Sequence, residues 1–227
     1  MHIKVNKIFL ILLFFFIFMS NIVAAEGIRP EISNLTGSQF TVSWVSELPN
    51  TSYVQLYQDD ALLKTLFDDR GKHYFGCTHY ITIIGLNENT EYNYVINEIQ
   101  GEEIINDGQR YHITTGQNMI PVGTFQPAGQ VFLDDGQTPA LNSIVYITVS
   151  NSNEQSAPLS TIVDKNGFWF VELINARNAD YQSLYPLSNS DILGVKVYSE
   201  QKDDVHLEMP VKNIKDRTQM CSPIILN

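Results

Sequence analysis

Apolar and polar residues alternate in short stretches along most of the chain after residue 26. The stretch 39–45 is typical, because a period of two places Phe40, Val42 and Trp44 on one face. That period is the one of a β-strand with a single buried face. Nowhere beyond residue 26 do apolar residues recur at helical spacing over three turns. The pattern therefore predicts a fold built of strands.

Turn signals rich in Pro, Gly, Asn and Asp separate these stretches. In the first half of the chain, strands are expected at 39–45, 52–58, 79–86, 91–99 and 109–115. In the second half, they are expected at 129–133, 143–150, 160–163, 168–173, 192–199, 205–209 and 220–226. Segment 175–190 lacks periodicity and is expected to be a long loop. Short strands at this spacing favour β-sandwiches.

The first 25 residues have the pattern of a secretory signal peptide. Lys4 and Lys7 precede an unbroken apolar run at 8–19, and small residues end the segment at Ala24 and Ala25. The alternative is an uncleaved anchor, but this run is short against the roughly 20 residues of a membrane span. We expect a secreted, extracellular or cell-surface protein, or a periplasmic one in a Gram-negative source, with no stable membrane insertion after cleavage.

A polar stretch containing Pro121 and Pro127 divides the rest of the chain. We therefore expect an all-β protein: two tandem immunoglobulin-like β-sandwich domains after an N-terminal signal peptide. The expected boundaries are 1–25 for the signal peptide, 26–116 and 128–227 for the domains, and 117–127 for the linker.

The charge narrows the class of partner. The 227 residues carry a formal net charge of −11, which becomes −13 when Lys4 and Lys7 leave with the signal peptide. Such a chain lacks the clustered basic residues that bind phosphate, so neither nucleic acid nor an anionic membrane surface is expected as a partner. With two cysteines, the chain is not a disulfide-stapled miniprotein.

The segment Leu86-Asn87-Glu88-Asn89-Thr90-Glu91-Tyr92 is the most specific local pattern in the first domain. Together with Trp44 and the ending Thr114-Thr115-Gly116, it makes residues 28–116 resemble a fibronectin type III domain. The resemblance implies structural roles for Trp44, Leu86, Thr90 and Tyr92. In that family the hydroxyl corresponding to Tyr92 forms the tyrosine corner, a bond to backbone just upstream.

Residues 128–227 resemble the carboxypeptidase regulatory-like, or transthyretin-like, sandwiches. The resemblance is carried by Gly129-Gln130-Val131-Phe132, by 135–140, and by 160–170, which includes Trp169 as a structural residue. Modules of both families serve as spacers, adhesion modules and accessory parts of enzymes, so neither resemblance names a ligand.

His73, Cys77 and His79 form the one cluster of soft metal ligands in the sequence, and are candidates for zinc or copper. The competing interpretation is a loop leading into a strand, with Cys77 packed or paired. Cys77 and Cys221 are the two thiols, and export favours their oxidation. They are a candidate disulfide between the two domains, and the alternative is two unpaired, buried thiols.

Asp68, Asp69 and Asp107 are candidate calcium ligands, because carboxylates are the groups that calcium prefers. The alternative for the loop 68–71 is a structural pair between an aspartate and Arg70 that staples the loop.

The sequence contains no Gly-rich phosphate loop, no Gly-x-Ser-x-Gly elbow and no His-Glu-x-x-His helix. We interpret the chain as a non-enzymatic protein without a cofactor, which offers two sandwiches for protein or glycan binding, adhesion or spacing at the cell surface. One alternative is an accessory module pair of a secreted hydrolase, of phosphatase or peptidase type, with a separate catalytic partner. A third is a small catalytic or metal site at His73, Cys77 and His79.

Overall fold

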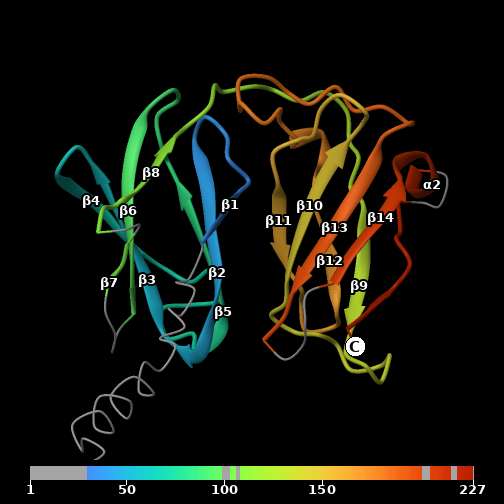
Figure 1. Cartoon of the computed structure of the whole chain (residues 1–227), viewed down its shortest axis with the longest axis horizontal. Coiled ribbons are helices and arrows are strands. Elements are labelled where there is room, and N and C mark those ends of the chain that lie inside the picture. Colours follow the sequence, from blue (N-terminus) through green and yellow to red (C-terminus); the bar gives the residue numbers. More distant parts are fainter. Residues whose placement is uncertain (1–29, 99–102, 106–107, 201–204, 216–218, 227) are drawn as a thin grey trace, which may run out of the picture.

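The computed structural model describes residues 30–98, 103–105, 108–200, 205–215 and 219–226. The predicted signal peptide and Asp107 lie outside these residues. The described chain is nearly all β and forms two β-sandwiches that lie side by side (Figure 1). The predicted all-β class is therefore confirmed.

The N-terminal sandwich consists of two antiparallel sheets. One sheet has the order β1–β2–β5, with bounds Glu31–Ser33, Gln39–Asn50 and Gly76–Ile84. The other has the order β4–β3–β6, with β7 and β8 both paired to β6. Its bounds are β3 Ser52–Gln58, β4 Ala61–Phe67, β6 Glu91–Glu98, β7 Glu103–Ile104 and β8 Tyr111–Thr114.

The core of this sandwich follows the alternation in the sequence. Phe40, Val42 and Trp44 all point into it and are at most 2% exposed. The predicted tyrosine corner is present, because the backbone N–H of Asn87 donates to the Tyr92 hydroxyl at 3.0 Å. This bond ties the crossing between the two sheets to a side chain of the core.

The C-terminal sandwich packs a four-stranded sheet on a three-stranded one. The first has the order β11–β10–β13–β14, with bounds Leu159–Ile162, Ile144–Ser150, Ile192–Tyr198 and Val205–Pro210. The second has the order β12–β9–β15, with bounds Phe168–Phe170, Ala128–Phe132 and Ile224–Ile225. Trp169 is 1% exposed between the sheets. Two short helices, η1 Leu173–Asn175 and α2 Val211–Lys215, complete the sandwich.

The structure corrects some element boundaries. Strands β1, β4 and β7 and helix α2 were not predicted, and the strand expected at 168–173 ends at Phe170, with two residues between it and η1, which begins at Leu173. Segment 175–190 carries two isolated bridges, Ser156 with Asn178 and Arg177 with Leu184, so backbone pairing holds part of it. Among the described residues, no helix has the length and apolar character to span a membrane.

Candidate functional site

The two sandwiches contact each other through a surface that the sequence pattern did not predict. Thr41 and Ser43 of β2 and Thr78 and Tyr80 of β5 alternate with core residues, so they point away from the core of their own sandwich. They are nevertheless at most 6% exposed. The sheet β11–β10–β13–β14 of the other sandwich covers them (Figure 1). We call this contact the inter-sandwich interface.

Aromatic side chains occupy the centre of this interface. Tyr80 of β5 packs with Ile144 and Tyr146 of β10. The Tyr80 hydroxyl donates to the carbonyl of Ser160 at 3.0 Å, and the hydroxyls of Ser43 and Tyr146 share a hydrogen bond of 2.7 Å. Burial raises the pKa of both tyrosines. Both hydroxyls therefore stay protonated and available as donors.

Asn34 connects the sandwiches through backbone and side chain together. Its backbone N–H donates to the carbonyl of Pro158 at 3.0 Å, and its Oδ1 accepts from the N–H of Ser160 at 2.9 Å. Its Nδ2 donates to the Tyr80 hydroxyl at 3.0 Å and to the carbonyl of Ser160 at 3.1 Å. The residue has φ of 52°, a left-handed conformation that asparagine tolerates better than most residues. Asn34 thus extends the edge of β11 as a strand would.

Arg70 organises a second group of contacts at one end of the interface. Its guanidinium binds the carboxylate of Asp68 through two bonds, of 2.7 and 2.8 Å, and donates to the carbonyl of Thr78 at 2.6 Å. It lies 3.5 Å from the centroid of the Tyr74 ring. Asp68 also accepts the backbone N–H of Tyr80 at 2.9 Å. The predicted structural aspartate–arginine pair is therefore present.

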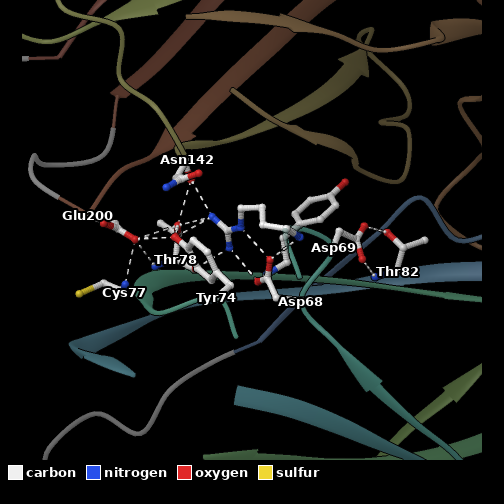
Figure 2. A network of polar contacts seen from close by, with 10 residues as sticks. Asp68, Asp69, Tyr74, Cys77, Thr78, Thr82, Asn142 and Glu200 are labelled. Carbon is white, nitrogen blue, oxygen red and sulfur yellow. Dashed lines mark hydrogen bonds and ion pairs between the residues drawn. The ribbon is translucent and has the colours of Figure 1, made fainter. Parts of the chain in front are cut away.

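This group reaches across the boundary to two residues of the C-terminal sandwich, Asn142 and Glu200 (Figure 2). The Thr78 hydroxyl donates to the carbonyl of Asn142 at 2.9 Å. Glu200 accepts from the Tyr74 hydroxyl at 2.8 Å and from the N–H of Cys77 at 2.9 Å. Although burial acts to raise the pKa of Glu200, these hydrogen bonds outweigh it and lower that pKa. The carboxylate of Glu200 is therefore charged when it accepts the backbone N–H groups at the start of β5.

Arg177 attaches the linker to the C-terminal sandwich. It is 5% exposed, and its Nη1 donates to the carbonyl of Gln117 at 2.7 Å. A Cβ on the neighbouring Gly116 would lie 2.5 Å from the carbonyl oxygen of Tyr181, so the linker passes too close for any side chain there. The linker therefore leaves the N-terminal sandwich along a defined path.

The structure does not bring the three candidate zinc or copper ligands together. His79 is 1% exposed, stacks on Trp44 with ring centroids 4.7 Å apart, and lies 3.2 Å from the Ser46 hydroxyl. Burial lowers its pKa to about 4. His73 is exposed on the loop before β5. Within the described ranges, no group of three His, Cys, Asp or Glu side chains is arranged to hold a metal ion.

The candidate calcium ligands bind protein groups instead. Asp68 is occupied by Arg70, and Asp69 accepts from the backbone N–H of Thr82 at 2.9 Å and from its hydroxyl at 2.6 Å (Figure 2). Asp107 lies outside the described residues, so calcium binding stays a prediction. Cys77 and Cys221 are both free thiols. Burial raises the pKa of each, to about 11 for Cys221.

The sequence did not predict a role at the boundary between the sandwiches for Asn34, Asn142, Ser160, Arg177 and Glu200. One signal was nevertheless present. The run Ile144-Val145-Tyr146-Ile147 is apolar on both faces of its strand, which is typical of a strand covered on both sides. No local pattern indicates the interface role of Asn34 or Glu200, because their partners lie more than 120 residues away in the sequence.

No protein-family model matches the sequence, and no curated protein matches it. Solved structures with a similar chain trace include arrays of fibronectin III-type domains. The FN1–FN3 domains of chicken CNTN1 have a TM-score of 0.29 and 12% identity, over 88% of this chain and 66% of that one. The central fibronectin-III array of RIM-binding protein has a TM-score of 0.28 and 12% identity, over 85% of this chain and 66% of that one.

The Yersinia pseudotuberculosis adhesin InvE has a TM-score of 0.25 and 12% identity, over 81% of this chain and 58% of that one. The chain thus spans less than two thirds of the length of each of these three structures. Similarity at these identities and TM-scores does not indicate what the chain binds.

Proposed function

We propose that the chain is an exported, non-catalytic protein whose two sandwiches form one rigid unit and present strand faces and loops to a protein or glycan ligand. In this proposal residues 1–25 are the signal peptide, residues 26–116 form a fibronectin type III-like module, and residues 128–227 form a carboxypeptidase regulatory-like module. The inter-sandwich interface is the observation that carries the proposal.

Two features of the interface support a fixed angle between the modules, and a third supports a non-catalytic role. It is held at separated points, by Asn34, by Tyr146 and by Glu200, so rotation about any one of them breaks bonds at the others. Its tyrosines are buried with their hydroxyls bonded, and breaking these bonds leaves polar groups to be solvated again. Tyr80, Tyr146 and Glu200 have shifted pKa values, and all three side chains form hydrogen bonds across the boundary. Structural bonds of this kind shift a pKa without any catalytic role.

Small-angle X-ray scattering of the exported form, purified after expression of the full chain, tests this proposal. We expect the profile to fit one rigid two-sandwich particle, and the fit to be the same at about 0.05 M and about 0.5 M salt because the central contacts are uncharged or buried. The double variant Asn34→Ala/Tyr146→Phe should require a range of angles between the sandwiches. Gln182→Ala, an exposed substitution, is the control. A profile of the unchanged chain that requires a range of angles between the sandwiches would contradict the proposal. N-terminal sequencing of the same sample tests whether the signal peptide has been removed.

A further inference from the structure

A groove of about 420 Å³ opens on the outer face of the sheet β11–β10–β13–β14, beside the inter-sandwich interface. The N-terminal sandwich covers the part of this face around Ile144 and Tyr146, and contributes Glu31 to the lining of the groove. The remaining lining comes from β10, β13 and β14 and from the loops beside them. A volume of this size lies within the range of small-ligand sites.

The register of the strands defines the floor of this groove. Tyr146 of β10 lies opposite Lys196 of β13, which lies opposite His206 of β14, so these three side chains share one face. In the next row, Thr148 lies opposite Gly194. A Cβ at Gly194 would approach the Thr148 hydroxyl to 2.9 Å and His206 Nε2 to 3.7 Å. A glycine inside a central strand marks a place where something approaches the backbone closely, and here it keeps the floor open.

Aromatic rings line the groove and are held in place by contacts with one another, with Lys196 of the lining and with Ser43 outside it. The rings of Tyr146 and Tyr198 meet edge to face, with centroids 5.4 Å apart. The Tyr146 hydroxyl is bonded to Ser43, and the Lys196 ammonium lies 4.2 Å from the centroid of the Tyr198 ring. Tyr181 adds a third ring to the lining and has φ of 61°. This backbone conformation is unfavourable for a bulky residue, and it occurs where surrounding contacts impose it, often at functional sites. The groove is therefore preorganised.

We propose that this groove binds an oligosaccharide of neutral hexoses, an inference that rests on the proposed function because it names the ligand class and the surface used. A sugar ring has an apolar C–H face, which packs against aromatic rings, and a rim of hydroxyls that donate and accept hydrogen bonds. The lining supplies both kinds of partner, with tyrosine rings beside the polar groups of Thr148, Gln155 and His206. The lining holds one carboxylate, of Glu31, and one ammonium, of Lys196, so it concentrates no positive charge, and the net charge of −11 of the chain disfavours a polyanionic ligand.

Titration calorimetry of the exported form with cellotetraose, maltotetraose and mannotetraose, and with tetragalacturonate as an acidic probe, tests this inference. We expect one neutral probe to bind at one site per chain, with a dissociation constant of roughly 0.1–1 mM for a ligand of this size in an open groove. The double variant Gln155→Ala/His206→Ala changes two groove residues. Both side chains are exposed, so the fold should be retained. It should weaken binding about tenfold or more.

His112→Ala is the matched control, because His112 is an exposed histidine on β8 of the other sandwich. Its affinity should equal that of the unchanged chain. The inference is overturned if no neutral probe binds, if tetragalacturonate alone binds, or if the groove variant binds as well as the control. Scattering from the same samples separates the two proposals, because a rigid particle that binds no sugar leaves the proposed function in place.

Discussion

Arg70 is the residue on which most contacts at the end of the interface depend. Its partner Asp68 has a side chain only 3% exposed, so removal of the guanidinium would leave a buried carboxylate without its cation. Arg70→Ala should therefore lower the free energy of unfolding by about 3–5 kcal/mol. Arg70→Lys should be intermediate, because an ammonium keeps the charge but cannot bind both carboxylate oxygens in the same way.

Urea unfolding followed by tryptophan fluorescence measures these changes. Arg110→Ala is the control, because Arg110 pairs with a fully exposed aspartate, Asp60, at 3.6 Å. Loss of such a surface pair costs about 1 kcal/mol or less. Equal losses in Arg70→Ala and Arg110→Ala would show that the Asp68 pair carries no special weight.

His79 should make the stability of the protein depend on pH. Its pKa is about 4 in the folded state against 6.5 in the unfolded chain, because burial disfavours the charged ring. As the pH falls below about 6.5, the unfolded chain takes up a proton that the folded one does not, so stability decreases until the pH reaches about 4. Between about pH 7.5 and pH 5, this histidine alone should remove about 2 kcal/mol.

The variant His79→Phe keeps a ring against Trp44 and removes the titrating group. Unfolding free energies measured at both pH values should therefore differ less in the variant than in the unchanged chain, by the contribution of His79. An identical pH dependence in both proteins would rule out His79 as its source.

At the scale of elements, the pairing of β9 with β12 depends on one close approach. Gly129 of β9 lies opposite Trp169 of β12, and a Cβ at Gly129 would come within 2.8 Å of the indole ring. Because Trp169 is 1% exposed in the core, the ring has little room to move.

Gly129→Ala should therefore destabilise the protein by about 1–3 kcal/mol through overpacking. Thermal unfolding followed by circular dichroism measures the change. Gln130→Ala, one residue further along β9 with its side chain on the opposite face, should shift stability by about 0.5 kcal/mol or less. A Gly129→Ala protein as stable as the Gln130→Ala protein would contradict the packing described here.

Most strands predicted from the sequence are those in which apolar residues recur on at least one face, whether or not the other face is also buried. Strand β2 illustrates this, because Phe40, Val42 and Trp44 alternate with smaller polar residues. Strand β4 was not predicted, since most of its side chains are exposed and Leu62 and Leu63 break the alternation. An edge strand is held by backbone bonds to one neighbour, and such bonds leave no period in the side chains. Helix α2, at five residues, is too short for a helical period to show.

At the scale of the whole molecule, the interface should make the two sandwiches unfold together. Separate modules joined by a free linker unfold independently, whereas a shared interface adds its free energy to both. We expect scanning calorimetry to show one transition for the unchanged chain and two for Asn34→Ala/Tyr146→Phe, which removes bonds at two separate points of the interface.

The single substitution Gln182→Ala should leave one transition, because Gln182 is exposed. Two transitions in the unchanged chain would mean that the interface contributes little to stability.

The interface itself was not predicted, for a physical reason. Thr41, Ser43 and Thr78 are small polar residues of the kind that also face water, and nothing in a local sequence distinguishes the two environments. Their burial depends on Tyr146 and Asn142, which follow in another sandwich. The all-β sandwich class and the strand faces were accessible from local pattern, and the tyrosine corner from the resemblance to fibronectin type III domains. The angle between the modules and the groove beside them arise from packing over long sequence separations.

Because Asn34 lies at the interface, the expression host should decide whether the interface forms. Asn34, Leu35 and Thr36 form an acceptor sequence for N-linked glycosylation. A sugar attached to Nδ2 would occupy the atom that donates to Tyr80 and to Ser160. Added in a eukaryotic secretory pathway before the sandwiches meet, it would keep them apart. The same gene should therefore yield a rigid protein from bacteria and a jointed one from glycosylating cells.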